Sequence, residues 1–261
     1  MKQSEKAIET KNLSISWNKI NVLNKLNFKL DGGEKLAIVG PSGSGKSTIL
    51  KILAGLILPT EGELQIFGEK QKYLRLDQNN PPDVRLVFQN AALLGSLTIE
   101  ENVGFLLERN KKLSKKLIHE IVCECLEEVG LFNVEKKLPN ELSGGMQKRV
   151  SFARALITDP NLNKDCKPIL LFDEPTAGLD PIASSRIEDL INKTNDKANG
   201  SSIVVSHVLS TIERTSDKVL MLYGGKFRWA GSIDEFKHSQ DPYVIQFRNG
   251  NLNGPMQPKD I

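Results

Sequence analysis

Residues Gly40 to Thr48 read GPSGSGKST, directly after the apolar run LAIV from Leu36 to Val39. The stretch fits the pattern G-x-x-x-x-G-K-[ST] between a predicted strand and a predicted helix over Lys46 to Leu58, the context expected of a phosphate-binding loop. Its glycines let backbone N–H groups face phosphate oxygens, and the helix amino terminus adds partial positive charge. We predict that a nucleotide is bound by Gly40, Pro41, Ser42, Gly43, Ser44, Gly45, Lys46, Ser47 and Thr48.

Two acidic residues follow another apolar run, ILLF from Ile169 to Phe172. Ligands collect at the carboxyl ends of strands in open α/β sheets, so Asp173 and Glu174 are candidates for chemistry. Asp173 is predicted to hold Mg²⁺ through its water shell, together with the Ser47 hydroxyl, and Glu174 to orient or deprotonate the attacking water. The alternative is that both carboxylates only cap the helix that follows Pro175.

Two further polar residues follow apolar runs in the same way. Gln89, after Arg85 to Phe88, has a donor and an acceptor end and is a candidate to sense metal and water, with a plain surface glutamine as the alternative. His207, after Ser202 to Val205, is a candidate to bond the terminal phosphate, although a lone histidine is usually structural. Trp17 is a candidate to stack on adenine, with a core tryptophan of the β layer as the alternative.

A second glycine turn, LSGGMQKR from Leu142 to Arg149, lies far downstream of the phosphate loop. Its Ser143 is a favoured N-cap, so an ordinary capped helix is one interpretation. A helix start with Gly144 and Gly145 is also an anion-binding surface. One chain is a poor candidate to present both turns to the same phosphates, and two chains sharing two nucleotides is the simpler geometry.

Hydrophobic periodicity predicts the fold class. Alternation in Leu13 to Trp17 and in Leu26 to Leu30 indicates an antiparallel β layer, and the short continuous apolar runs indicate strands of a mainly parallel sheet. The period becomes helical between Gly95 and about Pro160. We therefore expect an α/β domain over residues 1–240 with a helical subdomain inserted at about 95–160, followed by a tail over 241–261.

Local signals place the ends of several elements. Thr98 and Glu101 fit a capping box, Ser114 fits an N-cap, and Gly130 fits a helix stop. Gly224 and Gly225 fit a hairpin turn. In the tail, Asp241 and Pro242 can start a short helix, and residues from Gly250 onward are expected to be poorly ordered.

Composition excludes several classes of protein. The chain has 261 residues, 39% hydrophobic, and its 35 basic and 32 acidic residues give a net charge of +3. These interspersed charges do not favour nucleic acid as a partner. Cys123, Cys125 and Cys166 show no metal-ligand spacing, so reduced thiols are expected. We expect no signal peptide and no spanning helix, hence a cytoplasmic protein that meets a membrane through a partner.

The order of these motifs resembles an ABC transporter nucleotide-binding subunit, a P-loop NTPase with the ABC-ATPase fold. The matching segments are Gly40 to Thr48, Gln89, Leu142 to Arg149, Ile169 to Pro175, Gly178 to Asp180, and His207. The resemblance implies a head-to-tail homodimer, with ATP between the Lys46 loop of one subunit and Ser143-Gly144-Gly145 of the other. It implies that Asp180 contacts the opposite subunit, that Trp17 lies under adenine and that Glu174 is the catalytic base.

The resemblance also implies membrane partners. The groove after Gln89 would receive a coupling helix from a permease, on the inner face of the membrane. Within the family, Ala92 to Asn102, Thr176 to Ile182 and the tail are similar to the ATPases of Mla-type phospholipid systems and their chloroplast TGD counterpart, which work with an MCE-type lipid-binding protein. Two departures concern Val208, where many members have an acidic residue, and the long loop Asn161 to Pro168.

Three other functions are weighed against phospholipid transport. They are transport of another cargo, a soluble ABC ATPase of repair, translation or cluster assembly, and a scaffold that binds ATP without hydrolysing it. A single phosphate loop and a modest helical insert argue against the soluble class. The presence of Glu174 and His207 argues against the scaffold.

Overall fold

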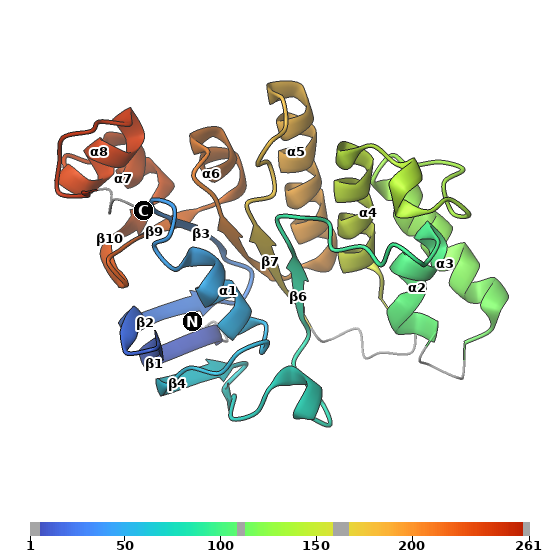
Figure 1. Cartoon of the computed structure of the whole chain (residues 1–261), viewed down its shortest axis with the longest axis horizontal. Coiled ribbons are helices and arrows are strands. Elements are labelled where there is room, and N and C mark those ends of the chain that lie inside the picture. Colours follow the sequence, from blue (N-terminus) through green and yellow to red (C-terminus); the bar gives the residue numbers. More distant parts are fainter. Residues whose placement is uncertain (1–5, 109–112, 159–166, 258–261) are drawn as a thin grey trace, which may run out of the picture.

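The computed structural model describes residues 6–108, 113–158 and 167–257, and the first part of the chain forms an antiparallel sheet. Its strand order is β2-β1-β4-β5, with β1 at Lys6–Trp17, β2 at Ile20–Asp31, β4 at Glu61–Ile66 and β5 at Glu69–Lys70. Leu13 and Ile15 of β1 are buried, as the predicted alternation requires. The predicted β layer is therefore confirmed, and it lies below the phosphate loop in Figure 1.

A second sheet forms the centre of the molecule, in the order β10-β9-β3-β8-β7-β6. The strands are β3 at Lys35–Val39, β6 at Val84–Val87, β7 at Ile169–Asp173, β8 at Ser201–Val205, β9 at Lys218–Tyr223 and β10 at Lys226–Ser232. All neighbours are parallel except β9 and β10, which form the hairpin predicted at Gly224 and Gly225. The predicted α/β class is confirmed.

The register of this sheet aligns the ends of four strands. Asp173 of β7 pairs with Val205 of β8, and Val205 pairs with Ile38 of β3. On the other side, Phe172 pairs with Val87 of β6. Residues that directly follow these strands therefore share one edge of the sheet, although they come from four distant parts of the sequence.

The helix after the phosphate loop is shorter than predicted. The expected range Lys46 to Leu58 is wrong, because α1 covers Lys46–Leu53. Gly55 has φ +69°, its N–H bonds to the carbonyl of Ile52, and the N–H of Leu56 bonds to that of Lys51. This pair of hydrogen bonds is a Schellman motif, which ends the helix at a left-handed glycine before Pro59 is reached.

Three helices follow β6 and pack around a separate apolar core, at the right of Figure 1. They are α2 at Ile99–Glu108, α3 at Lys115–Glu128 and α4 at Gly144–Leu156. The backbone N–H of Thr98 bonds to Glu101 at 2.6 Å and that of Glu101 bonds to the Thr98 hydroxyl at 3.2 Å, as a capping box requires. Ser114 caps α3, and Gly130 follows it with φ +68°.

The chain returns to the sheet through α5 at Pro181–Ala198 and α6 at Leu209–Thr215, and it ends with α7 at Ile233–His238 and α8 at Pro242–Asn249. Asp241 caps α8 as predicted. The expectation of a poorly ordered segment after Gly250 is wrong for residues 251–257. The buried amide of Gln246 donates to the carbonyl of Met256 and accepts from its N–H, both at 2.7 Å.

Cys123 and Cys125 are free thiols, as predicted, and burial raises the pKa of Cys125 to about 11. Within the described ranges, none of the helices is both long and apolar enough to cross a bilayer. Cys166 and most of the loop Asn161 to Pro168 lie outside the residues that the structure describes.

Candidate nucleotide site

Close neighbours leave no room for a side chain at two glycines of the phosphate loop. A Cβ atom on Gly40 would lie 2.1 Å from the carbonyl oxygen of Leu222, and one on Gly45 would lie 2.7 Å from a methyl of Leu23. Gly43 and Gly45 also have φ values of +74° and +100°. A side chain at Gly40 would displace the β9 backbone, one at Gly45 would displace the Leu23 side chain of β2, and one at Gly43 or Gly45 would strain the loop backbone.

The loop holds polar groups that suit a phosphate. The Lys46 ammonium donates to the carbonyls of Gly40 at 2.8 Å and Pro41 at 2.9 Å. Burial lowers the pKa of Lys46, while Glu174 and Asp173 oppose that shift. The Ser44 hydroxyl is buried and has no hydrogen-bond partner among the described residues. A buried hydroxyl without a partner is costly, and a phosphate oxygen would satisfy it.

Ser47 and Asp173 meet at the edge of the sheet. The Ser47 hydroxyl donates to Oδ1 of Asp173 at 2.9 Å, and burial raises the pKa of that carboxyl. In the described ranges no cluster of three or more His, Cys, Asp and Glu side chains is suited to a metal. Mg²⁺ usually binds one or two carboxylates together with substrate phosphates, so this sparse donor set fits a nucleotide-borne Mg²⁺.

Glu174 and His207 also lie together at this edge. Glu174 is 8% exposed, has φ +44°, and its N–H bonds to the carbonyl of Val205 at 2.9 Å. Its Oε2 lies 2.9 Å from Nδ1 of His207 and accepts a longer bond from the His207 backbone at 3.4 Å. The strained backbone turns this carboxylate toward His207, while Asp173 points to Ser47.

Gln89 and Trp17 are both solvent-accessible. Gln89 follows β6, whose register against β7 sets it at the same strand edge as Glu174. Trp17 ends β1 and is 48% exposed, so the alternative of a core tryptophan is wrong. Metal sensing by Gln89 and adenine stacking by Trp17 stay predictions.

The second glycine turn is a capped helix start that faces solvent. The Ser143 hydroxyl accepts from the N–H of Met146 at 3.3 Å, and Cβ atoms on Gly144 and Gly145 would meet nothing within 4 Å. Asp180 is likewise exposed and caps α5 through the N–H groups of Ile182 and Ala183. In Figure 1, α4 and α1 lie on opposite sides of β6 and β7, so one nucleotide on α1 would be remote from α4.

Lys148 connects α4 to the turn after Glu174, a role that the sequence did not predict. Its ammonium, on the second turn of α4, donates to the carbonyl of Ala177 at 2.7 Å and to that of Pro175 at 3.2 Å. Burial lowers the pKa of Lys148, and Glu174 opposes this. The helix that carries Ser143 is thus tied to the turn after Glu174. The sequence signals only a basic helix here, because the carbonyls are backbone groups of a distant segment.

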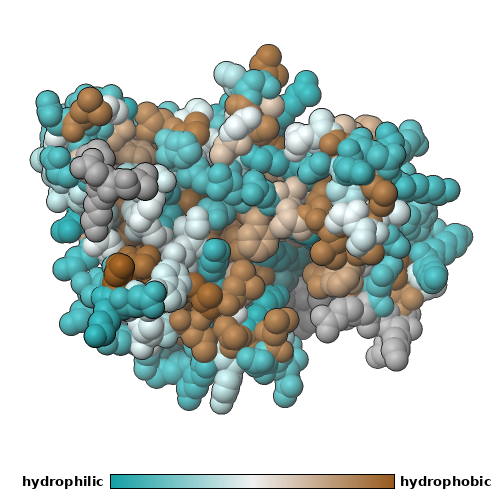
Figure 2. Space-filling model, viewed as in Figure 1, coloured by the Kyte–Doolittle hydropathy of each residue, from teal (hydrophilic) through white to brown (hydrophobic). Residues whose placement is uncertain are grey.

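Exposed apolar side chains flank a hollow beside the site. Figure 2 shows apolar surface over the end of α1 and over the helical region, separated by a recess. Large exposed apolar side chains near the end of α1 and near or on α2 include Leu56, Leu58, Leu94, Phe105 and Leu106. Paired apolar areas of this kind mark interaction surfaces.

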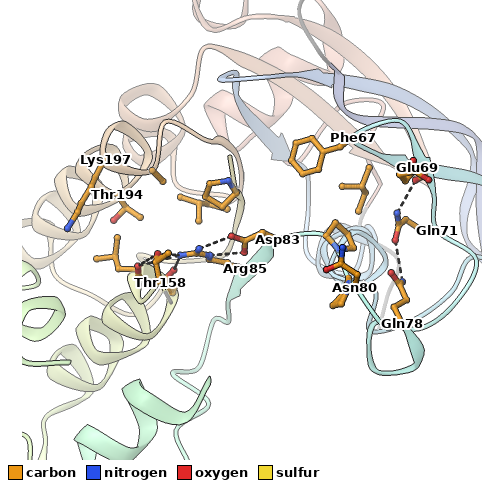
Figure 3. Close-up of a pocket in the computed structure, with 18 of the residues that line it drawn as sticks. Phe67, Glu69, Gln71, Gln78, Asn80, Asp83, Arg85, Thr158, Thr194 and Lys197 are labelled. Atoms are coloured by element: carbon orange, nitrogen blue, oxygen red, sulfur yellow. Dashed lines mark hydrogen bonds and ion pairs between the residues drawn. The ribbon is translucent and has the colours of Figure 1, made fainter. Parts of the chain in front are cut away.

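A cavity of about 1030 Å³ lies elsewhere, at the start of β6 and β7. Figure 3 shows Arg85 on its wall, and the Arg85 guanidinium already bonds Asp83 and the carbonyls at the end of α4. The cavity is therefore at the opposite end of the strands from Asp173 and Glu174. The guanidinium of Arg85 on its wall is already paired with protein groups.

Comparison with known proteins agrees with this geometry. A family model described as ABC transporter matches residues 23–177. The fold superposes on a solved dimeric bacterial ABC transporter cassette with a TM-score of 0.76 at 31% identity, covering 87% of this chain and 98% of that one. A cassette solved as a dimer in a post-hydrolysis state with ADP and Pi gives a TM-score of 0.75 at 30% identity, over the same shares of both chains. The chain belongs to the ABC transporter family and is an ABC ATPase.

Within the family, the similarity is to ATPases of the Mla and TGD type, which confirms the predicted resemblance. The chain is 47% identical to Protein TRIGALACTOSYLDIACYLGLYCEROL 3, chloroplastic, of Arabidopsis thaliana, over 97% of its own length and 76% of that protein. It is 35% identical to the intermembrane phospholipid transport system ATP-binding protein MlaF of Haemophilus influenzae, over 98% of its length and 95% of that protein. These relatives favour a transport ATPase over a soluble ABC ATPase or a scaffold.

Proposed function

We propose that this chain hydrolyses ATP to drive a permease that moves phospholipid across or between membranes. The observation that carries the proposal is the 2.9 Å contact between Glu174 and His207, beside the Ser47 and Asp173 pair. This arrangement would put a general base, Glu174, and a metal-binding pair, Ser47 and Asp173, at one strand edge. Similarity to a phospholipid transport ATPase supports the cargo class.

Hydrolysis requires a held triphosphate and an oriented water. Lys46 would exchange its loop carbonyls for the outer phosphates, and the Ser44 hydroxyl would gain a partner. Ser47, Asp173 and Gln89 would hold Mg²⁺, which neutralises charge on the phosphates. Glu174 would accept the proton of the attacking water, while His207 fixes the carboxylate and bonds the terminal phosphate.

The active unit is proposed to be a homodimer with two ATP molecules at its interface. The turn Ser143-Gly144-Gly145 faces solvent with open space around both glycines, so a second chain's triphosphate can reach the helix start. Asp180 is exposed and would contact the opposite subunit. Two solved relatives are described as dimeric, which supports this arrangement.

The permease is proposed to dock on the apolar surfaces at the end of α1 and on α2, with its coupling helix in the recess between them. An amphipathic helix would cover these side chains and lie next to Gln89, which links docking to the site. This arrangement puts the chain on the cytoplasmic face of the membrane, where ATP is supplied. An MCE-type lipid-binding protein is the proposed further partner, and the tail 241–261 a further contact surface.

The test is reconstitution of the full chain with its permease in phospholipid vesicles. We expect ATP-dependent movement of a labelled phospholipid, co-purification of phospholipid with the complex, and loss of both ATP binding and transport in Lys46→Ala. The control is Lys193→Ala, at an exposed position on α5, which should keep transport. Transport of another solute only, with no movement of the labelled phospholipid, would contradict the proposed cargo.

A further inference from the structure

Three buried polar side chains, Thr176, Thr211 and Glu188, form a hydrogen-bond network that begins two residues after Glu174. Thr176, Thr211 and Glu188 are 3%, 0% and 1% exposed. The hydroxyls of Thr176 and Thr211 lie 2.8 Å apart, and the Thr211 hydroxyl is 2.8 Å from Oε1 of Glu188. The three residues come from the turn after β7, from α6 and from α5. None of them touches the phosphate loop through a side-chain hydrogen bond in the described part of the chain.

The hydrogen bonds of this network have a definite direction. Oε2 of Glu188 lies 3.3 Å from Nε of Arg214, and Oε1 accepts from Ser210 at 3.2 Å as well as from Thr211. An ionised carboxylate only accepts, so Thr211 gives its single proton to Glu188. The Thr176 hydroxyl must then donate to Thr211. The protons are therefore donated from Thr176 to Thr211 and from Thr211 to Glu188. Each hydroxyl donates to the next residue, so the loss of one acceptor leaves the preceding hydroxyl without a partner.

Two members of this network, Thr176 and Thr211, belong to the segments that follow the two proposed catalytic residues. Thr176 is in the tight turn after Glu174, where the N–H of Ala177 bonds to the carbonyl of Glu174 at 3.1 Å. Thr211 lies in the first turn of α6, the helix that begins shortly after His207. The direct contact of Glu174 with His207 is open to solvent, because the His207 side chain is 60% exposed. The buried hydrogen bond between Thr176 and Thr211 therefore connects the segment after Glu174 with the segment after His207 out of contact with solvent.

We propose that Glu188, acting through Thr211 and Thr176, is a positioning residue that sets how Glu174 and His207 face each other. It controls the rate of ATP hydrolysis without contacting ATP. A buried, fully paired network of this kind holds its members in one arrangement, because breaking any link leaves a buried polar group without a partner. The inference rests on the proposed function, in which Glu174 is the base.

The test compares three variants of the full chain in a steady-state ATPase assay. Thr211→Val keeps the shape and removes the link, so we expect kcat to fall on the order of tenfold with the KM for ATP nearly unchanged. Thr211→Ser keeps the hydroxyl and should restore most of kcat. Thr215→Val is the matched control. Among the described residues, the hydroxyl of this buried threonine on the same helix bonds only to the carbonyl of Thr211, at 2.6 Å, so the variant should keep kcat.

A second measurement separates positioning from loss of stability. Melting temperature should fall in both Thr211→Val and Thr215→Val, but only Thr211→Val should lose turnover. Full kcat in Thr211→Val, or an effect on KM alone, overturns the inference. If Thr211→Val does not fold, Thr176→Val tests the same link from the other side, against Thr176→Ser.

Failure of the proposed function would look different. In a Glu174→Gln background, Thr211→Val should cause no additional loss, since the group that it positions is already gone. If Glu174→Gln alone keeps full turnover, the base assignment is wrong. If Glu174→Gln is inactive while Thr211→Val is fully active, the base stands and the positioning role of Glu188 is wrong.

Discussion

Nδ1 of His207 lies 2.9 Å from Oε2 of Glu174, although the two residues belong to different strand ends. The contact depends on β7 and β8 being parallel neighbours, with Asp173 opposite Val205. It also depends on the left-handed backbone of Glu174, which turns this carboxylate away from that of Asp173. The geometry gives the two adjacent carboxylates different partners, and so different predicted roles.

Replacement of Glu174 tests its predicted role as the catalytic base. In Glu174→Gln, the amide cannot accept a proton from water, so we expect ATP turnover to fall by about 10² to 10⁴. ATP binding should persist, because Lys46 and Ser47 are unchanged, and size analysis should show an ATP-bound dimer. The control Glu213→Gln changes an exposed carboxylate on α6 and should keep turnover. Unchanged turnover in Glu174→Gln would show that another group is the base.

A charged substitution tests whether the second glycine turn, Ser143-Gly144-Gly145, contacts the nucleotide of a second subunit. In Gly144→Asp, the new side chain meets open space in the monomer, so folding and loading of one nucleotide should be almost unaffected. A carboxylate facing the partner's terminal phosphate should prevent ATP-driven closure through like-charge repulsion. Gly144→Ala is the matched uncharged control. Persistence of ATP-dependent dimers in Gly144→Asp, seen by size analysis, would exclude this turn from the interface.

The capping box of α2 predicts a pH dependence of stability. The Thr98 backbone N–H, followed by its hydroxyl, lowers the pKa of Glu101 below its ordinary value of 4.5. A carboxyl with a lowered pKa in the folded state stabilises the protein above the unfolded pKa, and this contribution disappears as pH falls through the folded pKa.

Thermal melts of Glu101→Gln against the wild type measure this effect. The variant should melt lower at neutral pH, and the gap should close as pH falls below 4.5. Glu124→Gln, an exposed position within α3, controls for loss of one negative charge and should show no comparable gap. A difference in melting temperature that stays constant down to strongly acidic pH would show that the effect of Glu101→Gln does not come from loss of the carboxylate charge.

Two glycines of the phosphate loop predict different costs of the same substitution. Gly40→Ala forces a methyl to within 2.1 Å of the Leu222 carbonyl, so the free energy of unfolding should fall by about 1–3 kcal/mol or more. Gly43→Ala meets open space and carries only the left-handed backbone cost of about 1–2 kcal/mol. Urea denaturation of both variants provides the comparison, and an equal or reversed order would contradict the close contact of the loop with β9.

Much of the site was predictable because its signals are local. The phosphate loop needs glycines, a lysine and a hydroxyl at fixed spacing between a strand and a helix, and Gly40 to Thr48 supplies them within one stretch. The capping box at Thr98 and the hairpin at Gly224 are also set by a few adjacent residues. The helix end was predicted wrongly, since Pro59 suggested a later stop than Gly55 imposes.

The sequence by itself determined the kind of protein, because contiguous motifs record which backbone conformations and which functional groups are present. Tertiary structure alone decided which of those groups meet. The Glu174 to His207 contact, the Lys148 bonds to the turn at Pro175 and the buried link from Thr176 to Glu188 each join distant segments. Such contacts depend on strand register and helix packing, which bring together side chains that no local spacing relates.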